Sequence, residues 1–156
     1  MTKRRRSLGV LGEPLTNDYR AIAAIAQREM NRAVRRDDPM AGRQAVNKSY
    51  LAAVHAAREI VECSGMTFRT SGAGRSSRDM GRVATLVGER KLVDKPTQNV
   101  LRAFSKAAGQ HRACFYDGVC SMPEMAETVR FVRKALKHVP HTCTVLRRTG
   151  KQGAGA

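Results

Sequence analysis

Apolar residues recur at helical spacing along most of the chain, most clearly between residues 38 and 65. There the apolar positions step by four, four, three and four residues, which places them on one face of a helix. They are Val46, Tyr50, Val54, Ala57 and Val61. Asp38 before Pro39 is a helix start signal, and Gly65 is a stop signal. Alanines in the middle of the stretch let a neighbour approach closely, as in a bundle centre or a self-pairing face.

The same periodicity predicts four further helices, over residues 17–36, 77–92, 96–116 and 121–139. The last of these is well marked, because Ser121 and Glu124 have the spacing of a capping box. Its apolar residues are Met125, Val129, Val132, Leu136 and Val139. We expect this helix to end at Pro140, because proline does not fit a helix interior.

These elements define the fold class that we expect. No internal repeat or strand pattern is present, and with 4% aromatic residues and no Trp the core must consist of small aliphatic side chains. A chain of 156 residues suits one domain. We therefore predict an all-α bundle of about five helices over residues 17–140. A flexible basic arm (1–16) precedes it, and a basic, Gly-rich, disordered tail (141–156) follows it.

The charge balance points to a polyanionic partner. The chain has 29 Lys and Arg residues against 13 Asp and Glu, a net charge of +16. Such a surface attracts nucleic acid first, without distinguishing RNA from DNA, and acidic proteins or anionic lipid next. The basic residues of the arm and of the loop at 66–77, with the first turn after it, are the candidate contacts: Lys3, Arg4, Arg5, Arg6, Arg69, Arg75 and Arg78. A solvated end is the simpler interpretation of the arm.

The loop at 66–77 also contains SGAGRSS, whose backbone N–H groups could surround a phosphate. It lacks the Gly-Lys-Ser/Thr ending of a Walker loop, and no strand is evident before it. We favour a basic loop over a nucleotide site, and we expect no cofactor.

Metal and membrane sites are not indicated either. His111 and Cys114 are spaced like a ligand pair, but the His and Cys residues match no familiar zinc pattern, so we expect no metal. We interpret the four cysteines as reduced thiols. Because no apolar segment has the length of a membrane helix, we expect a cytoplasmic protein.

The best candidate site is the segment QHRACFYDG, with His111, Arg112, Tyr116 and Asp117. His111 and Arg112 could hold a phosphate and move a proton, as RNA cleavage by an internal 2′-hydroxyl needs. The alternative, which we favour, is that Arg112 pairs with Asp117 or another acid while Tyr116 packs and hydrogen-bonds.

Two stretches resemble a known family. AVNKSYLAAVHAAREIVECSG is similar to the helix of prokaryotic HEPN-domain proteins in which an Ala-Tyr-Tyr-Ala-like core precedes His-Ala-Ala and a closing Gly. HRACFYDGVCSMPEMAETVRFVRKALKHV is similar to their final section. The resemblance, over about residues 18–139, implies an up-and-down helical bundle, often dimeric. The superfamily includes RNases, toxins and non-catalytic RNA- or nucleotide-associated modules.

The chain departs from the catalytic members of that family, in which an Arg is followed a few residues later by a His. Here His111 precedes Arg112, and the residues that follow within a few positions include Tyr116 and Asp117 but no His. Arg133 and His138 satisfy the bare spacing, but five helical residues separate side chains by about 140°. We therefore expect a non-catalytic, homodimeric protein that binds RNA or another polyanion through its basic surface. The alternatives are a metal-independent endoribonuclease of toxin–antitoxin type and an interaction module with a nucleotidyltransferase-like partner.

Overall fold

The computed structural model describes residues 18–65 and 78–154, and in these residues the chain is helical without any strand. The α-helices are α1 (Tyr19–Arg36), α2 (Pro39–Cys63), α3 (Arg78–Glu89), α4 (Lys95–Arg112), α5 (Met122–Ala135) and α6 (Val139–Ala154). A π-helix, η1 (Ala113–Asp117), extends α4, and a 3₁₀ turn, η2 (Leu136–His138), joins α5 directly to α6. Within the described residues this makes five helical rods, so the predicted all-α bundle is confirmed.

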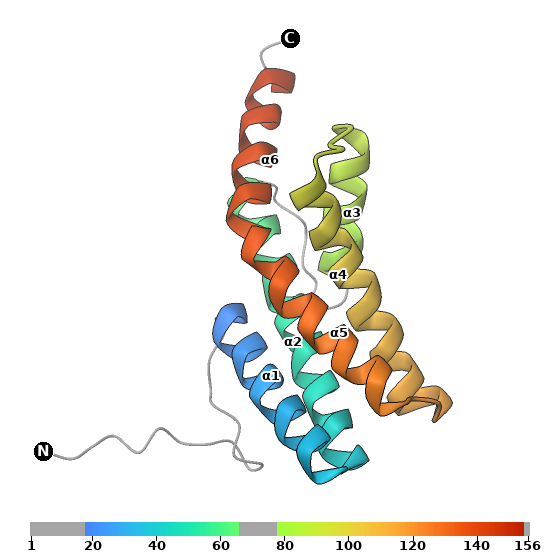
Figure 1. Ribbon diagram of the computed structural model, residues 1–156. Helices are drawn as coiled ribbons and strands as arrows, with labels where there is room; N and C mark the ends of the chain where they lie inside the picture. The colour runs from blue at the N-terminus through green and yellow to red at the C-terminus, as the bar shows by residue number, and fades with distance from the viewer. Residues whose placement is uncertain (1–17, 66–77, 155–156) are drawn as a thin grey trace, which may run out of the picture.

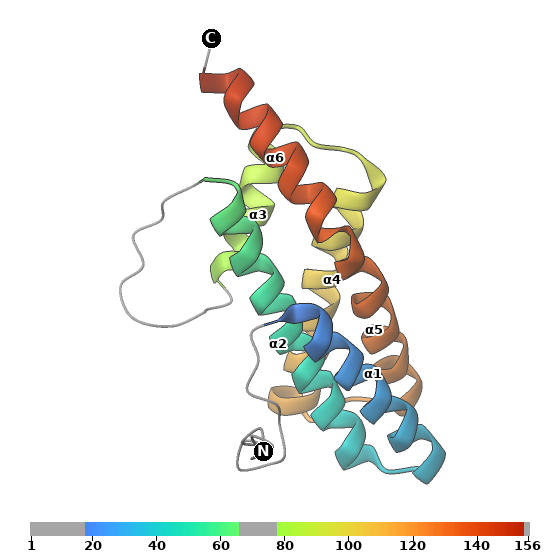
Figure 2. The ribbon, with the colours of Figure 1, turned by 90° about the vertical axis from the view of Figure 1, so that its left-hand side faces the viewer.

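α1 and α4 run in one direction, and α2, α3 and the rod of α5 and α6 run in the opposite direction (Figure 1). The α1–α2 turn and the α4–α5 turn lie at the same end of the bundle, and α6 extends toward the opposite end (Figures 1 and 2). The predicted arm at 1–16 and the loop at 66–77, with its SGAGRSS segment, lie outside the described residues.

Short polar side chains begin four of the helices. Each N-cap oxygen accepts a hydrogen bond from a backbone N–H in the first turn, which satisfies a donor that the helix itself leaves unpaired. The pairs are Asp18 with Arg20, Asp38 with Ala41, Asp94 with Thr97, and Ser121 with Glu124. The predicted starts of α2 and α5 are thus confirmed.

The core forms around α2. Its predicted apolar face is buried except for Tyr50, which is partly exposed. Its four central alanines have no exposed surface and lie at the bundle centre, against neighbouring helices of the same chain. They are Ala52, Ala53, Ala56 and Ala57. Lys48 is also buried and forms an ion pair with Glu29 that joins α2 to α1. The sequence pattern, which placed charged residues mostly away from this face, did not predict that pair.

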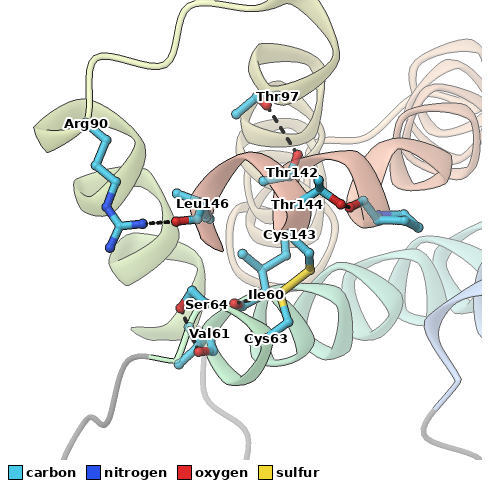
Figure 3. Close-up of a disulfide and its surroundings, with 11 residues drawn as sticks. Ile60, Val61, Cys63, Ser64, Arg90, Thr97, Thr142, Cys143, Thr144 and Leu146 are labelled. Carbon is cyan, nitrogen blue, oxygen red and sulfur yellow. Dashed lines mark hydrogen bonds between the residues drawn. A yellow bond between two sulfur atoms is a disulfide. The ribbon is translucent and has the colours of Figure 1, made fainter. Parts of the chain in front are cut away.

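The expected end of the last helix at Pro140 is wrong, and so is the expected disorder of the tail up to residue 154. Pro140 is the second residue of α6, and proline is tolerated in the first turn because that turn needs no N–H donor. Leu146 on α6 is fully buried. Arg90, which directly follows α3, donates from its guanidinium to the Leu146 carbonyl (Figure 3).

The interpretation of all four cysteines as reduced thiols is also wrong. Cys63 at the end of α2 and Cys143 in α6 form a disulfide (Figure 3). Next to it, the buried Thr142 hydroxyl donates to the Thr97 hydroxyl over 3.4 Å, so α6 is joined to α4 as well. Cys114 and Cys120 are free.

Candidate nucleic-acid interface

The four residues of the predicted site lie in one short segment, residues 111–117, where α4 ends. His111 and Arg112 are the last residues of α4, and Tyr116 and Asp117 are in η1. A π-helical turn contains one more residue than an α-turn, and such turns are frequent at functional sites. Gly118 follows with a left-handed backbone (φ +68°) that a residue with a side chain rarely adopts.

The His111 imidazole is held by aromatic rings. It stacks on Tyr50 of α2, with ring centroids 4.2 Å apart and an angle of 11° between the planes. Phe115 lies 4.9 Å from it, and Tyr116 meets it edge-on at 6.0 Å. Partial burial disfavours the charged imidazolium and so lowers the pKa of His111 below its usual value. The sequence indicated His111 but did not indicate its stack on Tyr50, because the two are 61 positions apart.

The rings on the outer side of this group are open to solvent. Tyr116 is 77% exposed and Phe115 is 44% exposed. Tyr116 is therefore not packed inside the protein, as our favoured alternative required. The Arg112–Asp117 ion pair of that alternative is not formed among the described residues, and both side chains are exposed. We call Tyr50, His111, Phe115 and Tyr116 the aromatic corner.

The second candidate pair is Arg133 and His138. No hydrogen bond, ion pair or ring contact joins them in the described part of the chain. Arg133 is exposed in the last turn of α5, whereas His138 is partly buried in η2. Neither pair therefore shows the linked acid, base and phosphate-binding groups of an assembled nuclease site.

The residues of α5, η2 and α6 form a basic surface that sequence analysis missed. No acidic residue follows Glu127 in the chain. Four exposed basic residues of α5 and η2 have the spacing i, i+3, i+4, i+7, which places them on one helix face, and two more are exposed on α6. They are Arg130, Arg133, Lys134, Lys137, Arg147 and Arg148, and we call them the basic rod. None of the six forms an ion pair within the described part of the chain.

The spacing could have revealed the basic rod, but the prediction of a disordered tail separated α6 from α5. Of the residues that we predicted to contact nucleic acid, the structure describes one. Arg78 is exposed at the first position of α3. The others (Lys3, Arg4, Arg5, Arg6, Arg69 and Arg75) lie outside the described residues.

The cysteines and histidines do not form a metal centre in the described segments, since no three metal-ligating side chains come together there. Burial and the neighbouring Cys120 raise the pKa of the Cys114 thiol to about 11, so Cys114 is a neutral thiol at physiological pH. Among the described helices, none has the length and apolar character to cross a membrane.

Comparisons with known proteins add no assignment. No protein-family model matches the chain, and neither a curated protein nor a solved structure shows significant similarity to it.

Proposed function

We propose that this chain is a HEPN-like helical protein that binds RNA through the basic rod without cleaving it. The observation that supports this function is the uninterrupted positive charge of α5, η2 and α6, whose six basic side chains are exposed and have no acidic partner in the described structure. Unpaired cations on a rigid helix attract phosphates and release counterions when they bind them.

The geometry of the rod suits an extended ligand. From Arg130 to Arg148 there are 18 residues, which correspond to about 27 Å of helix at 1.5 Å per residue. Apolar residues on the other side of the rod (Val129, Val132, Leu136 and Val139) are buried, so the charged face is fixed relative to the bundle. A preformed row of cations needs little ordering when it binds, which lowers the entropic cost of binding.

The test is binding of a labelled single-stranded RNA over a series of salt concentrations. The variant Arg130→Gln/Arg133→Gln/Lys134→Gln removes three charges from the rod. Each single-strand phosphate contact contributes about 0.7 to the slope of log affinity against log salt, so we expect the slope to fall by about 2. The matched control, Arg32→Gln/Arg35→Gln/Arg36→Gln, removes three exposed charges from α1 and should leave the slope nearly unchanged. An equal fall in both variants would show that net charge, and not the rod, determines binding.

The endoribonuclease alternative is tested in the same preparation. RNA incubated with the protein in EDTA and separated on a denaturing gel should remain intact. Cleavage that is lost in His111→Ala or in His138→Ala, with folding retained, would establish a metal-independent nuclease. The absence of both binding and cleavage would favour the third candidate, an interaction module. The expected homodimer and nucleotidyltransferase-like partner would then be sought by sedimentation and by co-purification.

A further inference from the structure

We infer that the aromatic corner binds an unpaired nucleobase by stacking, so that the RNA ligand of the proposed function is single-stranded where it meets α4 and η1. This inference rests on the proposed RNA binding, but it assigns a different contact to a different part of the surface. The basic rod would hold phosphates, and the corner would hold a base.

The first argument is the arrangement of the rings. Tyr50 and His111 already form a nearly parallel stack, and Phe115 and Tyr116 lie against the His111 ring. The stack on Tyr50 holds the His111 ring in place. Tyr116 is largely exposed, so its ring can contact a ligand. Successive aromatic side chains are the usual platform for unstacked bases in single-strand-binding proteins.

The second argument is composition. The chain has only seven aromatic residues, and three of them are in this corner. Phe115, Tyr116 and Val119, which is 71% exposed, place three exposed apolar side chains within five residues of the chain, and grouped apolar side chains on a surface are typical of an interaction site.

The third argument distinguishes a nucleic acid from a protein partner. The exposed guanidinium of Arg112 lies next to the rings in the chain, in a protein of net charge +16. The corner precedes α5 in the chain, and from Met122 to Arg130, the first residue of the rod, the helix advances by about 12 Å. A base with its phosphate matches this combination of ring faces and cations.

The experiment uses a short single-stranded RNA that contains 2-aminopurine, a base whose fluorescence is quenched by stacking. We expect the wild-type protein to quench it. The variant Phe115→Leu/Tyr116→Leu keeps apolar bulk but removes the ring faces. Because stacking contributes about 1–3 kcal/mol per base, we expect this variant to bind at least fivefold more weakly and to lose the quenching. The salt slope should stay as in the wild type. Val93→Ser, which changes an apolar residue that is 84% exposed in the α3–α4 connection, is the control.

Three outcomes would contradict parts of this scheme separately. If the wild type binds RNA without quenching, or if Phe115→Leu/Tyr116→Leu binds as tightly as the wild type, the stacking inference is wrong. The proposal that the basic rod binds RNA then stands. If Phe115→Leu/Tyr116→Leu still binds RNA but no longer self-associates, the aromatic corner is a protein interface instead. Adenosine 5′-monophosphate tests the corner alone through the NMR signals of the His111 ring. A shift of those signals in a protein that does not bind RNA would overturn the rod proposal and support the stacking site.

Discussion

Cys63 and Cys143 are 80 residues apart in the sequence, and their disulfide joins the end of α2 to α6 (Figure 3). The bond closes a loop that includes α3, α4 and α5. Because a closed loop restricts the unfolded chain, such a bond stabilises the folded state, and the effect grows with loop length.

Reduction of this disulfide should therefore destabilise the protein by about 2–4 kcal/mol. The measurement is urea unfolding with and without a reductant. The variant Cys63→Ser/Cys143→Ser should unfold at a lower urea concentration and should not respond to reductant. Alkylation of the denatured, unreduced protein should label two of the four cysteines. Labelling of all four would show that the bond is not present.

A second prediction concerns Asp79, a carboxylate in the first turn of α3 that is only 1% exposed. Arg82 of the same helix contacts it at 2.9 Å, and Arg58 of α2 at 3.8 Å. Asp79→Asn keeps the shape of the side chain but removes its charge. We expect a loss of about 1–3 kcal/mol in unfolding free energy, because the charge-assisted hydrogen bond from Arg82 is replaced by a weaker one and the ion pair with Arg58 is lost.

The control for Asp79 is the exposed pair Lys106–Glu127, which is separated by 3.6 Å on the surface between α4 and α5. Glu127→Gln should change stability by less than about 1 kcal/mol, as is usual for exposed ion pairs. Equal effects of the two substitutions would show that the burial of Asp79 does not strengthen its interactions.

The helices were predictable because their signals are local. The repeat of apolar residues in α2 and the cap at Ser121 depend on neighbours within one or two turns, and both predictions are confirmed. The continuation through Pro140 depends on contacts with distant segments instead. Leu146 is buried in the core and its carbonyl accepts from Arg90, so α6 is stabilised by packing that no local pattern records.

The candidate site was predictable only in part, for the same reason. His111 and Tyr116 are only five residues apart, so the segment around them could be found from the sequence. Tyr50 reaches the same corner from α2, and this relationship depends on how α2 and α4 pack. The Cys63–Cys143 bond likewise depends on the course of α6, which the sequence analysis had assigned to a disordered tail.

A third prediction concerns Asp94, which has two roles at the start of α4. Its carboxylate accepts from the Thr97 backbone N–H, and it lies 2.8 Å from Nε2 of His141 on α6. Asp94→Ala removes both interactions and should cost about 1–2 kcal/mol. Asp94→Asn retains a cap but loses the charge, so it should cost less. The loss in Asp94→Asn measures the charged contact with His141, and the difference between the two variants measures the cap. Equal losses in urea unfolding would mean that the cap contributes nothing.

Partial burial of Asp94 acts to raise its pKa, but the hydrogen bonds from Thr97 and His141 outweigh it, and the pKa lies below the usual value. A carboxyl group whose pKa is lower in the folded state stabilises the protein above its unfolded pKa and ceases to do so as pH falls. The stability difference between the wild type and Asp94→Ala should therefore shrink below about pH 4.

The last prediction is the pH dependence of the aromatic corner. Burial lowers the pKa of His111 in the folded protein, whereas an unfolded histidine titrates near 6.5. Between these two values the unfolded state binds more protons, so His111 should make stability fall as pH drops below about 6.5, until the folded pKa is passed. His111→Phe keeps a ring on Tyr50 but cannot titrate. The difference in unfolding free energy between wild type and variant should be constant above about pH 7.5. On acidification the unfolding free energy of the wild type should fall relative to that of the variant. An NMR titration should give a His111 midpoint below 6.5, and a midpoint above 6.5 would mean that a nearby acid, and not burial, dominates the environment of this ring.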